Sequence, residues 1–156
     1  MADRTYMGKP PDQKLKRAFF TGTTALGEGY TLCYDADQGT AASVDVSRAW
    51  EVEKPSSTTN MYNFAGVTTK AYAANDQGQW VEIAEPGSYA NVYAYLSTTV
   101  NATHMAFCAG QHYFYKSGLG GRGCAIALET EDRSSTAGLV FCYLEDGPQS
   151  GGCEIL

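Results

Sequence analysis

Hydrophobic and polar residues alternate along much of the chain, which is the pattern of β-strands with one buried face. The clearest stretch is residues 89–96, whose side chains fall in two sets, Tyr89, Asn91, Tyr93 and Tyr95 on one face and Ala90, Val92, Ala94 and Leu96 on the other. Residues 80–83 alternate in the same way. Residues 137–144 are instead continuously apolar, which predicts a strand buried on both faces.

Shorter apolar stretches between turn residues predict further strands. They lie at residues 19–20, 30–34, 50–53, 63–72, 105–108, 111–116 and 124–128. Only residues 125–129 would also suit a short helix. Short strands at this spacing, separated by glycine-bearing turns, are typical of sandwiches and barrels. We therefore predict an all-β fold, a single compact β-barrel or β-tulip-like sandwich over residues 18–156, with a loop-like tail from about residue 146.

Residues 1–17 differ from the rest of the chain in composition and charge, and predict an extended N-terminal arm. They hold five basic and two acidic residues, a net charge of +3, which leaves −9 for the remainder because the whole 156-residue chain carries −6. An acidic body argues against nucleic-acid binding, which requires a basic folded surface. The arm suits docking on an acidic protein surface, and a solvated terminus is the alternative.

Targeting and redox features point to a protein that folds in a cytoplasm. No apolar run approaches the roughly 18–20 residues of a membrane span, and the N-terminus lacks the hydrophobic segment of a signal peptide. The cysteines are odd in number and contain no C-x-x-C pair; they are Cys33, Cys108, Cys124, Cys142 and Cys153. In a reducing compartment this predicts free, mostly buried thiols.

Two motifs resemble ligand-binding motifs, but the sequence around each of them argues against a binding site. Gly118-Leu-Gly-Gly-Arg-Gly123 matches the dinucleotide-binding G-x-G-x-x-G, but only 33 residues follow it, so a flexible hairpin loop is favoured. His104, Cys108 and His112 have the spacing of zinc ligands on a helix, but Ala109-Gly110 predicts a turn that separates them. We expect structural roles for these three residues.

The sequence shows no arrangement of a nucleophile with a base, and no marked cleft around its carboxylates. We therefore predict no catalytic residue, no metal ligand and no cofactor, and expect that the protein is not an enzyme. A small hydrolase or metal enzyme is kept as an alternative, with bound zinc as its cheapest test. The tyrosine row Tyr89, Tyr93 and Tyr95 could stack on sugars, contact a partner protein, or pack in the domain's own core.

Four stretches carry a resemblance to a known group of proteins. They are Phe64-Ala-Gly-Val-Thr-Thr-Lys-Ala-Tyr72, Gly78-Gln-Trp-Val-Glu-Ile-Ala-Glu-Pro-Gly87, Tyr89-Ala-Asn-Val-Tyr93 and Thr136-Ala-Gly-Leu-Val-Phe141. Over about residues 64–144 the chain resembles capsid decoration (cement) proteins of tailed bacteriophages. The resemblance implies a small β-barrel without catalytic residues that sits on the outer capsid surface, often as a trimer, and holds neighbouring major capsid proteins together.

We therefore expect a structural virion protein, made in the host bacterial cytoplasm, with two partners: the major capsid protein and itself, as a homo-trimer. No nucleic acid and no membrane are expected as partners. The expected capsid contacts are Lys9, Lys14, Lys16 and Arg17. The expected contacts between copies are Tyr93, Tyr95, Ile155 and Leu156. The alternative function is a carbohydrate-binding or adhesive β module of a phage tail fibre or host surface, using exposed tyrosines and Trp80.

Overall fold

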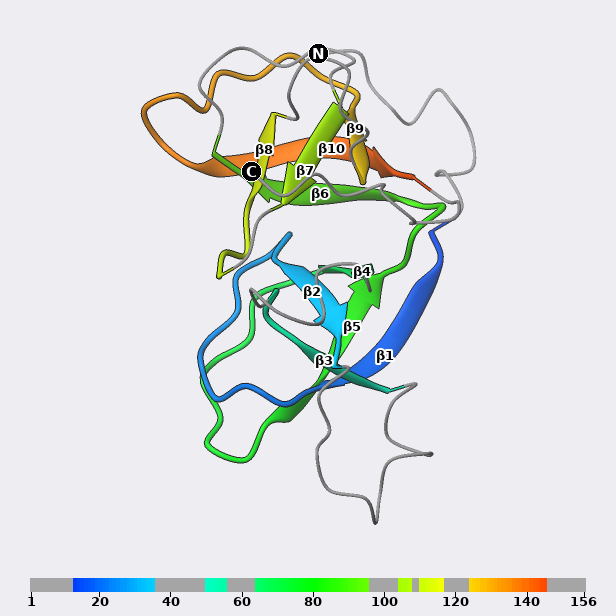
Figure 1. Cartoon of the computed structure of the whole chain (residues 1–156), viewed down its shortest axis with the longest axis vertical. Coiled ribbons are helices and arrows are strands. Elements are labelled where there is room, and N and C mark those ends of the chain that lie inside the picture. Colours follow the sequence, from blue (N-terminus) through cyan, green and yellow to red (C-terminus); the bar gives the residue numbers. More distant parts are fainter. Residues whose placement is uncertain are drawn as a thin grey trace.

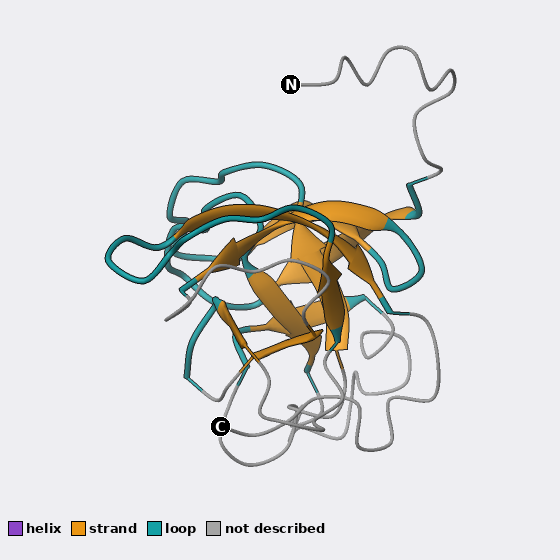
Figure 2. Cartoon of the chain, turned by 90° about the horizontal axis from the view of Figure 1, so that it is seen from above, coloured by secondary structure: helices purple, strands orange, loops and turns teal. Residues whose placement is uncertain are grey.

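The computed structural model describes residues 13–35, 50–55, 64–95, 104–107, 110–116 and 124–145. Within these ranges the secondary structure consists of strands (Figures 1 and 2). They are β1 (Leu15–Phe20), β2 (Thr31–Tyr34), β3 (Glu51–Glu53), β4 (Phe64–Thr68), β5 (Gln79–Ala84), β6 (Tyr89–Ala94), β7 (His104–Phe107), β8 (Phe114–Lys116), β9 (Ala125–Ala127) and β10 (Gly138–Leu144). The all-β prediction is confirmed, and the stretch that also suited a short helix is β9. In the described ranges no helix is long and apolar enough to cross a membrane.

The strands close into two five-stranded barrels, where the sequence predicted one. The first barrel has the order β1-β3-β2-β4-β5 and the second β10-β6-β8-β7-β9. β1 pairs along its whole length with β5, from Leu15 opposite Ala84 to Phe20 opposite Gln79, and this pairing closes the first barrel. Figure 1 shows the second barrel stacked above the first along the long axis. Strand patterns look the same whether strands form one barrel or two, because only long-range pairing distinguishes them.

The barrels share a hydrophobic core. The inward side chains of the first barrel form one cluster, which comprises Ala18, Phe20, Leu26, Leu32, Val52, Ala65, Val81 and Ile83. The cluster of the second barrel extends into the first, because it includes Cys33, Phe64, Val67 and Ala84. Phe64 of β4 lies with its ring centroid 5.5 Å from that of Phe107 and 6.2 Å from that of Phe114. Apolar packing therefore continues from one barrel into the other.

Backbone hydrogen bonds also join the barrels, and Gly29 is at the centre of them. The N–H of Gly29 donates to the Thr68 carbonyl at 2.8 Å, and its own carbonyl accepts from the N–H of Tyr93 in β6 at 2.9 Å. Gly29 is buried and has a φ of 76°, which glycine adopts without steric cost. A Cβ at this position would lie 2.6 Å from the Tyr93 nitrogen. Only glycine lets the two backbones approach this closely.

β10 buries one face, although its continuous apolar run predicted burial on both. Val140, Cys142 and Leu144 are fully buried, whereas the alternate residues are half-buried. Tyr143 of β10 lies opposite Tyr89 of β6, and their ring centroids are 5.3 Å apart. The prediction was wrong because the outer residues of β10 are apolar for a different reason: they pack on an aromatic row outside the barrel.

The last residues of the predicted arm, residues 1–17, lie in the first barrel. β1 begins at Leu15, and the N–H of Glu85 donates to the carbonyl of Lys14 at 2.8 Å, so the last residues of the predicted arm belong to the first barrel. Composition and charge marked the boundary in the sequence, and neither shows that β1 has already begun at Leu15. Residues 1–12 with Lys9, the glycine motif at 118–123, and residues 146–156 with Ile155 and Leu156 lie outside the described residues.

Candidate functional site

Two aromatic features among the described residues are candidate sites, one on the first barrel and one at the junction of the barrels. The tryptophan cluster comprises Arg17, Phe19, Trp50 and Trp80. The tyrosine pocket is lined by Tyr30, Lys54, Tyr93, Tyr95, Gln111, His112, Tyr113 and Ala137.

The tryptophan cluster follows from the alternation of β1 and its pairing with β5. Leu15, Arg17 and Phe19 point outward because Ala18 and Phe20 are buried in the barrel. Phe19 lies opposite Trp80 in the register of the two strands, and their rings meet edge-on at 5.5 Å. The arrangement is a row of apolar side chains on the outside of a barrel.

Two indole rings stand in contact at this surface, and a guanidinium group lies over one of them. The rings of Trp50 and Trp80 are 6.5 Å apart and nearly perpendicular, and each tryptophan is 48% exposed. The guanidinium carbon of Arg17 is 5.4 Å from the ring centroid of Trp80, a cation–π contact. Aromatic residues and arginine are the residue types enriched at protein interfaces relative to the rest of the surface.

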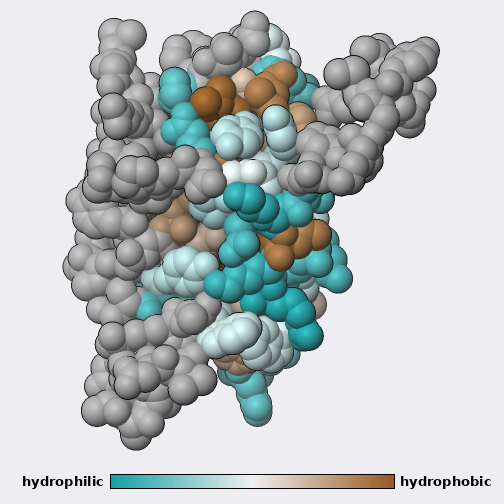
Figure 3. All heavy atoms as spheres, turned by 90° about the vertical axis from the view of Figure 1, so that its right-hand side faces the viewer, coloured by the Kyte–Doolittle hydropathy of each residue, from teal (hydrophilic) through white to brown (hydrophobic). Residues whose placement is uncertain are grey.

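The three described residues of the predicted basic contact do not act as one group. Lys16 lies on the opposite row of β1 from Arg17, and its Nζ donates to the Tyr34 hydroxyl at 2.9 Å. Its ammonium group is also 4.7 Å from the Tyr34 ring centroid. Of Lys14, Lys16 and Arg17, only Arg17 joins the tryptophan cluster. Figure 3 faces the side of β1 and shows hydrophilic and intermediate side chains with small, separate apolar patches.

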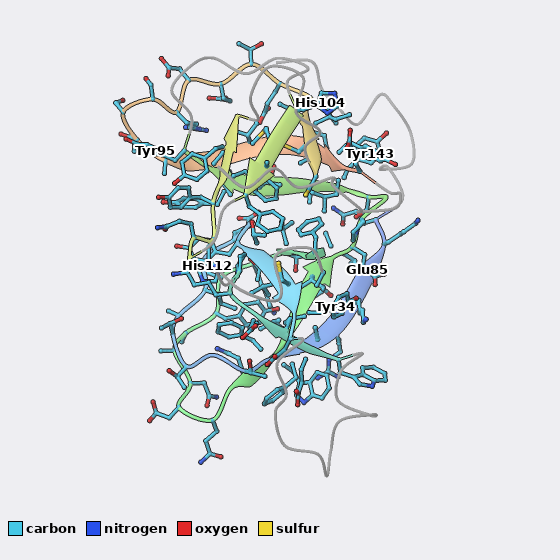
Figure 4. The ribbon with its side chains drawn as sticks, viewed as in Figure 1. Tyr34, Glu85, Tyr95, His104, His112 and Tyr143 are labelled. Carbon is cyan, nitrogen blue, oxygen red and sulfur yellow. The ribbon has the colours of Figure 1, made fainter. Side chains whose placement is uncertain are left out.

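The tyrosine pocket lies where the two barrels meet, is open to solvent and has a volume of about 310 Å³. The first barrel contributes Tyr30, just before β2, and Lys54, just after β3. The second barrel contributes side chains from β6 and its end, from the turn before β8, and from the residue before β10. In Figure 4 the labelled Tyr95 and His112 lie on the same side of the molecule. The pocket is therefore built from segments far apart in the sequence.

Ring contacts hold the walls of the pocket. Tyr30 lies between His112, stacked at 4.8 Å, and Tyr93 at 5.1 Å. Tyr113 meets Tyr93 at 6.4 Å and Tyr95 at 6.0 Å. Of the two tyrosines predicted to contact another copy, Tyr93 is thus half-buried against rings of its own chain, while Tyr95 remains 43% exposed.

His112 is a structural residue at the edge of this pocket. Its Nδ1 lies 3.0 Å from the Thr31 carbonyl, and its own carbonyl accepts from the N–H of Thr31 at 2.9 Å. Burial lowers the pKa of His112; the Thr31 hydrogen bond acts against this, and the charge of Lys54 lowers the pKa further. The imidazole is therefore neutral at neutral pH.

The residues with zinc-like spacing do not form a site in the described part of the chain. His104 begins β7, and its Nδ1 is 3.2 Å from a carboxylate oxygen of Glu145. Figure 4 shows His104 near the top of the molecule and His112 at the left of its middle, well apart. Cys108 lies outside the described residues, and within them no three His, Cys, Asp or Glu side chains gather closely enough to hold a metal ion.

The described cysteines depart in part from the expected free thiols. Cys33 and Cys142 are free and buried, as predicted. Burial raises the pKa of both thiols, and the charges of Glu53 and Glu129, respectively, raise it further. Cys124 is disulfide-bonded, so the prediction was wrong for this residue. Spacing along the sequence does not reveal which cysteines the fold brings together.

Comparison with known proteins finds a structure of similar fold. No protein-family model matches the chain, and no curated protein sequence matches it. Among solved structures it is similar to the head fiber gp8.5 N base in bacteriophage phi29, with a TM-score of 0.51 and 12% sequence identity. The similarity covers 86% of this chain and 95% of that chain, and therefore extends across both barrels. At this level of identity, what the two proteins share is their fold.

The sequence interpretation missed members of both aromatic features. Trp50 was seen only as the start of a strand, and Tyr30 and Tyr113 were not considered as site residues. Tyr113 and Tyr115 repeat at the period of a strand, as Tyr93 and Tyr95 do, and this repeat is the one signal that could have been used. The partnership of Tyr30 with His112 depends on the stacking of the barrels and leaves no local pattern.

Proposed function

We propose that the protein is a structural, non-enzymatic component of a tailed-phage particle that binds the outer surface of the assembled capsid and bridges major capsid protein subunits as a homo-trimer. The observation that supports this most directly is the fold similarity to a phage head fiber base across both barrels. The resemblance of residues 64–144 to capsid decoration proteins points in the same direction.

The tryptophan cluster is the surface that suits docking on the capsid. Trp, Tyr and Arg side chains contribute most of the binding energy at protein interfaces. The rings of Trp50 and Trp80 already contact one another, so docking would cost little side-chain entropy. Arg17 supplies a positive charge that would steer the surface toward an acidic partner.

The stabilising effect would arise from mass action. A protein that binds the assembled lattice and not free capsid subunits stabilises the lattice by the free energy of that binding. A trimer that contacts several subunits at once gains avidity beyond that of a single interface. Light scattering tests this oligomeric state, since a trimer has three times the 16.8 kDa mass of the chain.

Co-sedimentation with the phage's capsids tests the docking surface. We expect wild-type protein to pellet with capsids, and Trp80→Ala to bind about thirtyfold more weakly, as expected for a residue worth about 2 kcal/mol at an interface. Arg17→Glu should also weaken binding. The matched control is Leu128→Ala, which removes a side chain of similar exposure, 45%, from the second barrel.

The outcomes separate the function from the surface. Wild-type protein that fails to pellet with capsids would contradict the proposed function. Wild-type binding that survives both Trp80→Ala and Arg17→Glu would contradict the tryptophan cluster as the docking surface.

A deletion that tests the predicted N-terminal arm must leave strand β1 intact. Removing residues 1–17 would cut Leu15–Arg17 out of β1 and open the first barrel. Removing residues 1–12 deletes Lys9 and leaves β1 whole. We expect this shorter deletion to weaken capsid binding without lowering the melting temperature; undiminished binding would contradict a role for the arm.

A further inference from the structure

We propose that the tyrosine pocket is a saccharide-binding site that accepts one pyranose ring. This inference goes beyond the proposed capsid role, because it concerns a second surface and a second class of ligand. Three observations carry it: the size of the pocket, the chemistry of its lining, and its position relative to the tryptophan cluster.

The size of the pocket suits a small ligand. Its volume of about 310 Å³ lies at the lower limit of small-molecule sites, which range from about 300 to 1,000 Å³. A pocket of this size can hold a sugar ring at a chain end.

The chemistry of the lining suits a pyranose. A pyranose has an apolar C–H face that can pack on an aromatic ring, and hydroxyl groups at its edge that require hydrogen-bond partners. Tyrosine meets both needs, because it combines an aromatic face with a hydroxyl group. Four of the eight lining residues are tyrosines, and the amide of Gln111 adds donors and an acceptor. None of these eight residues is a carboxylate, although the chain carries a net charge of −6.

The walls of the pocket are fixed before a ligand arrives. The N–H of Tyr95 donates to the Phe114 carbonyl at 3.0 Å, and the N–H of Tyr93 donates to the Gly29 carbonyl at 2.9 Å. The ring of Tyr113 contacts those of both Tyr93 and Tyr95. A ligand would therefore bind to rings that are already in position, which reduces the entropy cost of binding.

The pocket lies away from the tryptophan cluster, so a capsid protein docked on that cluster would leave the pocket uncovered. The cluster lies on the outer face of β1 and β5, and β1 is on the right in Figure 1. Tyr95 and His112 lie on the left of the same view in Figure 4. One face can thus engage the capsid while the other presents a sugar site to the surroundings.

Titration calorimetry of the full chain with three probes tests the site: methyl glucoside, methyl N-acetylglucosaminide and galacturonic acid. We expect at least one probe to bind with a millimolar dissociation constant. Tyr95→Ala should weaken that binding about tenfold, and Tyr95→Trp should preserve it because the stacking surface remains. Tyr113→Ala is a second variant with the same expected loss.

The matched control is Tyr143→Ala. Tyr143 is a half-buried tyrosine on the outside of the same barrel, on the opposite side from Tyr95 in Figure 4. Its replacement by alanine should therefore leave sugar binding unchanged. Thermal unfolding establishes that each variant is folded. Absence of binding for all three probes, or binding that survives both Tyr95→Ala and Tyr113→Ala, would overturn the proposal. Co-sedimentation of Tyr95→Ala with capsids should match wild type, which separates this inference from the proposed function.

Discussion

Tyrosine side chains in this protein differ in role, depending on what surrounds each side chain and its hydroxyl group. The hydroxyl of Tyr72 accepts from the N–H of Glu82 at 2.7 Å and so supports β5. The hydroxyl of Tyr34 accepts from Lys16 and fixes a charge at the barrel surface. Tyr95 keeps a large exposed area at the pocket. Identity alone does not separate structural from functional tyrosines; their neighbours in space do.

His112 gives the protein a pH-dependent stability. Its folded-state pKa lies below the ordinary value of about 6.5, so between those two values the unfolded chain binds a proton that the folded chain does not. Stability that is present above about pH 6.5 is therefore lost as the pH falls through this window. We expect the urea midpoint to drop between about pH 7.5 and pH 5.5, and to drop less in His112→Gln. An equal drop in both proteins would contradict this role of His112.

The turn that contains Gly29 is the element that sets how closely the barrels approach. Gly29→Ala should destabilise the protein by about 2 kcal/mol or more, because a methyl group adds backbone overlap to an unfavourable positive φ. Gly110 has the same φ of 76° but has no atom within 4 Å of an added Cβ. Gly110→Ala should therefore cost only about 1 kcal/mol, from backbone conformation alone. Urea unfolding measures both values, and equal losses would mean that the close approach contributes nothing.

The elements themselves could be predicted from the sequence because strand alternation is a local property. Val81 and Ile83 are buried while Trp80 on the other face is 48% exposed, as the pattern indicated. Pairing is not local: β1 pairs in parallel with β3, with Phe19 opposite Glu51, and nothing near either strand indicates it. The number of barrels and the start of β1 depend on such pairings, which the sequence pattern does not reveal.

The candidate sites were harder to predict than the strands because each combines distant segments. Tyr93 and Tyr95 were identified from their alternation in the sequence, yet the pocket also requires Tyr30 and Lys54 from the other barrel. Arg17 was selected for its charge, whereas its structural importance comes from Trp80 on a paired strand. Sequence patterns identified two members of each site, and the fold identified the residues that join them.

At the scale of the whole molecule, the shared core predicts that both barrels unfold together. Both tryptophans of the chain, Trp50 and Trp80, belong to the first barrel, so tryptophan fluorescence reports on that barrel alone. Far-UV circular dichroism reports on the strands of both. We expect the two urea transitions to coincide. Phe64→Ala, which removes a first-barrel ring from the shared core, should lower both midpoints equally. Separate midpoints in wild type would contradict a shared core.

The closure of the first barrel by β1 and β5 also bears on the order of events during synthesis. Leu15 pairs with Ala84, so β1 has no partner on that edge until nearly seventy further residues have been made. In the same way, β6 can pair with β10 only after Tyr143, the partner of Tyr89, has been made. Proteins dominated by such distant contacts fold slowly, in milliseconds to seconds. A nascent chain with residue 84 outside the ribosome but β7 and β8 not yet released would therefore present a first barrel able to close, with the Phe64 ring not yet covered by Phe107 and Phe114.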